Sequence, residues 1–264
     1  MIPLRRPVLP AGLAARIELK SEELRSGAAT TRAAREAWKA ARLVRAELGG
    51  VLGAMASGLE RCMYCGDSAG SSIDHFEPIV RAPLRAFDWL NHLLACTHCN
   101  SNHKRDQYPC DDTGACLLVD PSREDPYDHL RLTLSTGEYR AVTPKGAETI
   151  RVFGLGRRVL CRGREMAYPR CKSMLRDAVR QHAEGRDDIA REVEQALLAQ
   201  PFADVLYAMY RTLHTPGAAA VFEPDVLDAL RRVRLFAPPA GARAVVVPPR
   251  AGPGAAVARE APPG

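Results

Sequence analysis

The sequence has no apolar run of about 18 residues, which a membrane-spanning helix requires, so we expect the chain not to cross a membrane. Its start, Met1-Ile-Pro-Leu-Arg-Arg, lacks the apolar segment of a secretory signal peptide. No internal repeat is present, which excludes repeat architectures. These absences predict a cytoplasmic protein, in a reducing compartment where paired cysteines serve as metal ligands more often than as disulfides.

The composition is compatible with a sizeable core and a polyanionic partner. The length of 264 residues allows one large domain or two small ones. The hydrophobic content of 46% is enough for a buried core. The formal net charge is +6, with an isoelectric point near 9.0. This modest positive charge suits a polyanion but does not by itself identify one.

Two Cys-x-x-Cys pairs form the strongest local pattern, Cys62-Met-Tyr-Cys65 and Cys96-Thr-His-Cys99. Four thiolates at this spacing complete a tetrahedral structural zinc site, whose binding free energy becomes folding free energy in a small, loop-rich module. The alternatives are a pair of redox motifs, or thiols buried as small hydrophobic groups. His98 lies inside the second pair and is expected to be exposed rather than to bind the metal.

The other four cysteines do not share this spacing. Packing or idle thiols are expected for them, with a second zinc site as the alternative. They are Cys110, Cys116, Cys161 and Cys171.

An Asp-His dipeptide and two asparagines lie within the cysteine frame. Ser72 to Pro78 is expected to form a short strand with Asp74 and His75 at its end. Because successive strand residues face opposite sides, a bend is needed for both to serve one centre. A neutral imidazole suits the deprotonation of water, and Asp74 with the amide oxygen of Asn100 suits a sparse Mg²⁺ site. Each residue alone is more typical of a turn or a cap, but the combination favours metal-assisted phosphodiester cleavage.

Residues 62–108 resemble the HNH endonuclease motif in its zinc-stabilised, ββα-metal form. The resemblance lies in the two cysteine pairs, in Asp74-His75, in Asn91 and in Asn100 directly after the last cysteine. It implies that His75 is the general base and that Asn91 braces the loop. It also implies that Asp74 and Asn100 bind a catalytic Mg²⁺, Mn²⁺ or another divalent ion, beside a structural Zn²⁺.

One departure from the family pattern concerns the residues after Asn100. The family often has Cys-Asn-x-x-Lys, whereas here Lys104 comes one residue later and His103 takes its place. Both side chains are candidates to contact phosphate or the leaving group.

Shorter segments carry a second, looser resemblance over residues 30–165: Asn100-x-x-x-Lys-Arg-Asp-Gln-Tyr-Pro109, Leu117-Leu-Val-Asp-Pro121 with Asp125-Pro126, and Ala147-Glu-Thr-Ile150 with Gly154-Leu-Gly-Arg. They resemble the nuclease subunits of Septu-type anti-phage systems. That resemblance implies a role in defence and an ATPase partner. The predicted function is thus a divalent-metal-dependent HNH endonuclease acting on DNA. A stand-alone restriction-like or homing enzyme is a narrower alternative, and a non-catalytic zinc-finger module that binds nucleic acid or acts as an adaptor is the alternative from another class.

The predicted fold is α+β and mainly helical, with a ββα-metal module on a four-cysteine zinc site. The expected division is an N-terminal helical region at 1–56, the zinc-framed HNH module at 57–108, a loop and hairpin extension at 109–145, a C-terminal helical region at 146–236 and a disordered tail at 237–264. Helices are expected at 14–24, 31–55, 146–153, 157–167, 173–183, 187–199, 201–213 and 224–233, and hairpin strands at 130–134 and 139–142.

The helix expected at 31–55 has an apolar stripe opposite a basic one. The basic stripe either follows phosphates or is simply a solvated helix face. Its residues are Arg32, Arg35, Lys39 and Arg42.

Overall fold

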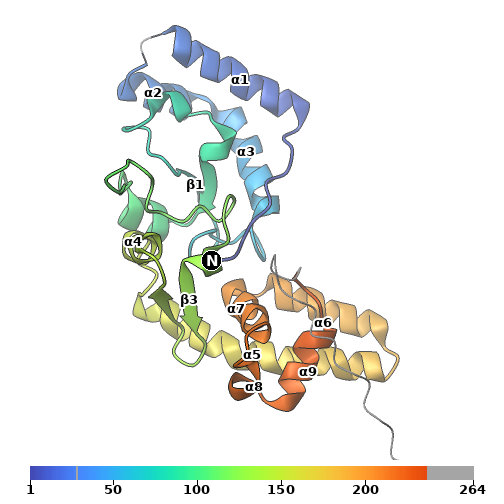
Figure 1. The fold of residues 1–264 in the computed structure, drawn as a ribbon. Helices are drawn as coiled ribbons and strands as arrows, with labels where there is room; N and C mark the ends of the chain where they lie inside the picture. Colours follow the sequence, from blue (N-terminus) through green and yellow to red (C-terminus); the bar gives the residue numbers. More distant parts are fainter. Residues whose placement is uncertain (28, 237–264) are drawn as a thin grey trace, which may run out of the picture.

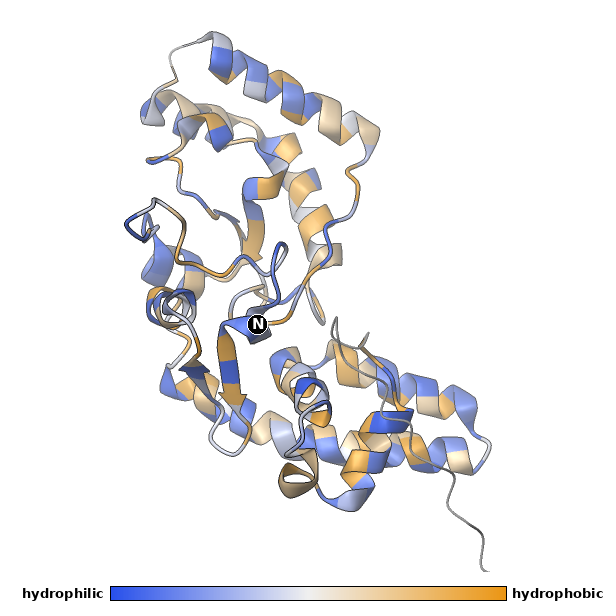
Figure 2. Cartoon of the chain, viewed as in Figure 1, coloured by the Kyte–Doolittle hydropathy of each residue, from blue (hydrophilic) through white to orange (hydrophobic). Residues whose placement is uncertain are grey.

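The computed structural model describes residues 1–27 and 29–236. The expected tail at 237–264 lies outside these residues. Helices at the two ends of the described chain form separate groups, with short strands and loops between them (Figure 1). Both groups carry hydrophobic and hydrophilic residues interspersed (Figure 2), as expected for helices with one buried and one exposed face. The fold is mainly helical with few strands, in agreement with the predicted class.

Three helices precede the cysteine frame: α1 (Ala11–Ser26), α2 (Thr31–Ala40) and α3 (Arg42–Met55). The single helix expected at 31–55 is therefore two, because Ala41 leaves the helical region with φ −78° and ψ 55°. The break turns α3 relative to α2. It allows the two helices to share an apolar cluster with α1 and with the loop that follows the first strand.

The cysteine-framed segment forms a ββα unit. Strand β1 (Ser72–His75) pairs antiparallel with β2 (His92–Ala95), in a register that places Asp74 opposite Leu93. Two short 3₁₀ turns, η1 (Pro83–Arg85) and η2 (Trp89–Asn91), lie between the strands. A π-helix, η3 (His98–Lys104), begins within the second cysteine pair and contains Cys99. The first strand is shorter than expected, and the second was not predicted as a strand.

A second hairpin follows, made of β3 (Leu130–Thr133) and β4 (Glu138–Ala141), as the sequence predicted. The short turn η4 (Pro126–Asp128) precedes it and helix α4 (Pro144–Val152) follows it. Gly137 at the hairpin tip has φ +68°, and a Cβ there would lie 1.9 Å from the carbonyl oxygen of Cys161. Only glycine therefore permits the hairpin to approach this closely.

Five helices complete the described chain: α5 (Arg158–Ala183), α6 (Asp187–Ala199), α7 (Ala203–Leu213), α8 (Ala218–Val221) and α9 (Pro224–Arg232). The two helices expected at 157–167 and 173–183 are one, with Pro169 inside it. Proline removes one helical hydrogen bond, but the residues on either side, Ala167 and Cys171, are fully buried. Packing against α6, α7 and α9 thus outweighs the local preference to end the helix.

A buried ion pair joins α5 to α7, and its arginine also bonds to the second hairpin. The Arg164 guanidinium donates to Asp204 at 3.1 Å and to the carbonyl oxygens of Gly137 and Leu155. Both side chains of the pair are almost wholly excluded from solvent. No helix of the described residues is both long and apolar enough to cross a membrane.

Candidate active site

The four predicted zinc ligands come together. The Sγ atoms of Cys62, Cys65, Cys96 and Cys99 all lie within 4.8 Å of one another, and all four residues are buried. Tetrahedral zinc with Zn–S bonds of about 2.3 Å places its sulfurs about 3.8 Å apart. The Cys65 and Cys96 sulfurs are 3.9 Å apart. The cluster is therefore compatible with a structural zinc site.

The electrostatics of the cluster point the same way. Hydrogen bonds among the thiols lower the pKa of Cys65 to about 6 and also lower that of Cys96. The same contacts raise the pKa values of Cys62 and Cys99. Four thiolates this close repel one another, so full ionisation of the cluster needs a cation. Among the described residues, no other set of cysteines, histidines and carboxylates forms such a group.

His75 is held on the face of β1 that looks towards the N-terminal helices. Its Nε2 lies 3.0 Å from the carbonyl oxygen of Ala86, which only accepts, so Nε2 carries the proton. Burial lowers the pKa of His75 below its usual value, so the ring is neutral near pH 7. The lone pair is then on Nδ1, which has no hydrogen-bond partner among the described residues. This is the protonation state that a general base requires.

Asp74 is held in a different way, on the opposite face of β1. Its Oδ1 accepts from the Lys104 ammonium at 2.9 Å, and its Oδ2 accepts from the Tyr64 hydroxyl. Burial and the neighbouring carboxylate raise the pKa of Tyr64, so the phenol stays protonated and donates. The Asp74 side chain is only 3% exposed. Each oxygen of Asp74 already accepts one hydrogen bond, so a divalent ion on Asp74 would have to use the remaining lone pairs beside the Lys104 ammonium or displace it.

The expected bend at the end of β1 is absent. The antiparallel ladder continues through the pair His75 and His92, so Asp74 and His75 keep the alternation of a regular strand. The strand stays regular because Asp74 bonds to Lys104 on one face and His75 bonds to the Ala86 carbonyl on the other. Among the described residues, no hydrogen bond or ion pair joins the side chains of Asp74, His75 and Asn100 to one another, and their shared role in one centre stays a prediction.

The π-helix accounts for the position of Lys104, one residue later than the lysine of the family pattern. The backbone N–H of Arg105 donates to the carbonyl oxygen of Asn100 at 2.7 Å, an i→i+5 bond of the wider helix. One extra residue per turn brings Lys104, rather than His103, back towards β1. Its ammonium is fully buried and also donates to the carbonyl oxygen of His75 at 2.7 Å. The Lys104 ammonium therefore pairs with Asp74, and its contact with a phosphate stays a prediction.

The other predicted residues lie around this centre. His103 lies against Gly154, where a Cβ would come within 2.6 Å of its ring, and burial lowers the pKa of His103. The side-chain amide of Asn100 donates to the Ser72 hydroxyl at 3.1 Å. Since Ser72 and Asp74 are two residues apart, Asn100 approaches the same face of β1 as Asp74.

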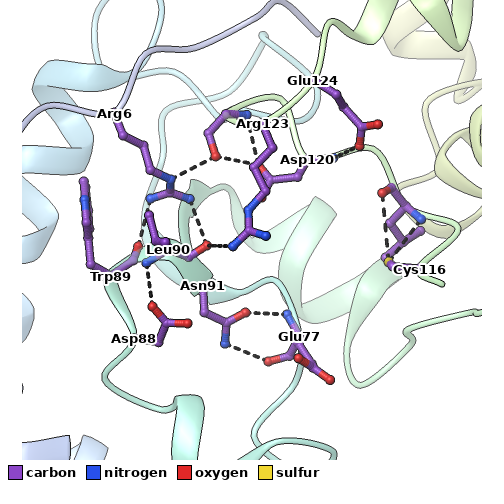
Figure 3. A network of polar contacts seen from close by, with 12 residues as sticks. Arg6, Glu77, Asp88, Trp89, Leu90, Asn91, Cys116, Asp120, Arg123 and Glu124 are labelled. Carbon is purple, nitrogen blue, oxygen red and sulfur yellow. Dashed lines mark hydrogen bonds and ion pairs between the residues drawn. The ribbon is translucent and has the colours of Figure 1, made fainter. Parts of the chain in front are cut away.

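Asn91 ties the two ends of the loop between the strands. Its Oδ1 accepts from the backbone N–H of Glu77 at 2.8 Å, and its Nδ2 donates to the Glu77 carbonyl at 3.0 Å (Figure 3). The same Nδ2 donates to the carbonyl oxygen of Arg85 at 3.3 Å. The side chain is fully buried. These contacts fix the loop that carries Ala86, the acceptor for His75, which is the geometry that a bracing role requires.

Residues 62–106 match the HNH endonuclease family. This match covers the ββα unit and both cysteine pairs. The chain is also similar to "Septu protein PtuB" of Bacillus mycoides (strain KBAB4), with 27% identity over 131 residues. That alignment covers 38% of this chain and 44% of the relative, so the chain spans less than half of the relative's length. No solved structure matches the chain.

Two residues that shape the HNH site were missed at the level of sequence. His92 is fully buried, and its Nε2 lies 3.0 Å from the same Ala86 carbonyl oxygen that His75 uses. Trp38 of α2 stacks on His92 at 4.9 Å and meets the His75 ring edge-on at 4.6 Å. The run His92-Leu-Leu-Ala between a turn and a cysteine was the available sign of a buried strand. Nothing in the sequence pointed to Trp38.

Proposed function

We propose that this protein is an HNH endonuclease that hydrolyses DNA phosphodiester bonds, with His75 as the general base. The observation that carries the proposal is the held imidazole of His75. The Ala86 carbonyl fixes the proton on Nε2, burial keeps the ring neutral, and Nδ1 is left to take a proton from water. The family match of the surrounding module supports the reaction class.

The divalent-metal requirement is also part of the proposal. In HNH enzymes the ion supplies charge stabilisation at the scissile phosphate. Asp74 and Asn100 are the proposed ligands, and Asp74 would bind the ion in place of, or beside, its present partners Lys104 and Tyr64. The structural metal on the four cysteines is proposed to be Zn²⁺, and the reducing cytoplasm is the proposed compartment because it keeps thiols reduced.

The test is nicking of supercoiled plasmid by the purified chain in Mg²⁺ or Mn²⁺. We expect His75→Ala to lower the cleavage rate by about 10²–10⁴-fold, the usual contribution of a general base. His98→Ala is the matched control, because His98 is exposed and its one side-chain hydrogen bond among the described residues is with Asn102 of the same helix. EDTA should abolish cleavage, and added Mg²⁺ should restore it. Equal rates for wild type and His75→Ala would refute the assignment of the base.

One observation favours a second function. A buried Asp74 paired with Lys104 is the arrangement of a structural residue, and it suits a non-catalytic zinc module that binds nucleic acid or serves as an adaptor. The same assay separates the two functions. The non-catalytic module would retard DNA in a gel without nicking it in either metal, whereas the nuclease would produce open circles.

We propose further that the chain acts in anti-phage defence together with an ATPase subunit. Its similarity to Septu protein PtuB supports this role. The test is phage plating on cells that express the chain alone, with a neighbouring ATPase, or with that ATPase and His75→Ala. Protection that needs both the ATPase and His75 would support the proposal, and equal plating in all three strains would refute it.

A further inference from the structure

An open groove of about 640 Å³ lies between helix α3 and strand β1, and it extends beyond the segment that matches the HNH family. Trp38 of α2 and Arg42, Arg45 and Gly49 of α3 line one side. Ser72 and Ile73 are among the residues that line the other side. The groove thus joins the N-terminal helices to the first strand of the HNH module.

The groove reaches Trp38, which contacts His75. Residues two apart on a strand face the same side, so Ile73 and His75 lie on one face of β1. Trp38 lines the groove and also contacts the His75 ring at 4.6 Å. A ligand that lies along the groove therefore reaches Trp38, the side chain that contacts the His75 ring.

The charges of the groove favour an anion. Arg42 and Arg45 lie one turn apart on α3, and neither pairs with a carboxylate among the described residues. Arg42 is exposed, whereas Arg45 donates from Nη2 to the carbonyl oxygen of Lys39 and keeps a buried Nε without a partner. Glu60 is the one acidic residue in the lining of the described groove, so the arginines outnumber it. By contrast, Arg32 on the neighbouring helix pairs with Glu36.

We propose that this groove binds the sugar-phosphate backbone of one DNA strand and delivers it to His75. Arg42 and Arg45 contact successive phosphates, and the Trp38 ring lies against a base or a sugar. The inference rests on the proposed function in taking DNA as the substrate. The basic stripe then has two roles. Arg42 contacts phosphate, whereas Arg32 forms a solvated ion pair with Glu36.

The glycines of α3 offer a sharp test. A Cβ at Gly49 or at Gly50 would meet no atom within 4 Å, so either position accepts a larger side chain. Gly49 lines the groove, while Gly50 does not and lies about 100° further round the helix. Gly49→Glu places a negative charge in the groove, Gly50→Glu places the same charge outside it, and Gly49→Gln adds the same bulk without charge. All three also replace glycine by a better helix former.

Binding is measured by fluorescence anisotropy with a labelled single-stranded DNA oligonucleotide, in the His75→Ala background so that cleavage does not interfere. We expect Gly49→Glu to weaken binding at least about tenfold, and Gly49→Gln and Gly50→Glu to change it less than about threefold, since charge repulsion at the phosphate is the cause. Arg42→Gln should reduce the slope of log affinity against log salt by about 1, and Arg32→Gln should leave it unchanged. Thermal unfolding of each variant checks that the fold is kept.

The outcomes separate this inference from the proposed function. If Gly49→Glu and Gly50→Glu weaken binding equally, or if Arg42→Gln leaves the salt slope unchanged, the groove is not the DNA site. That result would stand even if the wild-type chain nicks plasmid. If Gly49→Glu alone abolishes binding but the wild-type chain never cleaves, the groove is a DNA site on a non-catalytic module.

Discussion

Replacing Lys104 with methionine tests the contact that dominates the centre of the HNH module. The side chains of Lys104 and Asp74 are 0% and 3% exposed, so the variant leaves a carboxylate buried without its cation. Breaking a buried ion pair in this way costs about 3–5 kcal/mol. For a chain of this length each kcal/mol lowers Tm by about 2–4 °C, which gives a fall of roughly 6–20 °C.

The assay is thermal and urea unfolding of zinc-saturated protein. Lys20→Met is the matched control, because Lys20 pairs with Glu23 at the surface and an exposed pair contributes at most about 1 kcal/mol. Adding Asp74→Asn to Lys104→Met should recover most of the lost stability, since no buried charge then remains. If Lys104→Met costs no more than Lys20→Met, the pair does not stabilise the module and this reasoning is wrong.

Three further perturbations have equally definite outcomes. Cys96→Ser should lower the zinc content per chain and unfold the module, measured by metal analysis and circular dichroism, and full zinc retention would contradict the four-sulfur site. Asp204→Asn should cost about 3–5 kcal/mol in urea unfolding because Arg164 keeps its buried charge, and a change within about 0.5 kcal/mol would contradict this. Burial holds the pKa of His92 well below its usual value. Above pH ~6.5 the His92 ring is neutral in both the folded and the unfolded chain, whereas below that pH it takes up a proton only in the unfolded chain. The free energy of unfolding should therefore fall as pH drops below about 6.5, less steeply in His92→Gln, and parallel profiles for the two proteins would contradict the buried neutral ring.

Local patterns in the sequence were enough to predict the metal frame and the family. The Cys-x-x-Cys spacing fixes which thiols belong together, because two residues between ligands allow both sulfurs of a pair to bind one ion. The four thiols do meet, and residues 62–106 do match the HNH family. The second hairpin and most of the helices were also predicted, since their apolar periodicity and capping residues are local.

Local preference was wrong where packing outweighed it. Two helices were expected at 157–167 and 173–183, whereas α5 runs through Pro169 as one helix because buried neighbours on both sides hold it together. The run 31–55 predicted one helix, whereas Ala41 breaks it so that α2 can place Trp38 against His75. Neither the continuous α5 nor the break at Ala41 could be predicted from local sequence preferences.

The sequence by itself determined the chemical groups of the site: four thiols, one carboxylate, two amides and the imidazole of His75. Only the tertiary structure decided what each group faces, because a strand side chain takes its partners from elements far along the chain. The π-helix brings Lys104 to Asp74, the loop held by Asn91 brings the Ala86 carbonyl to His75, and α3 adds a groove with two arginines. Burial and pairing in the folded chain then set which of these groups is charged, and so which of them is ready to react.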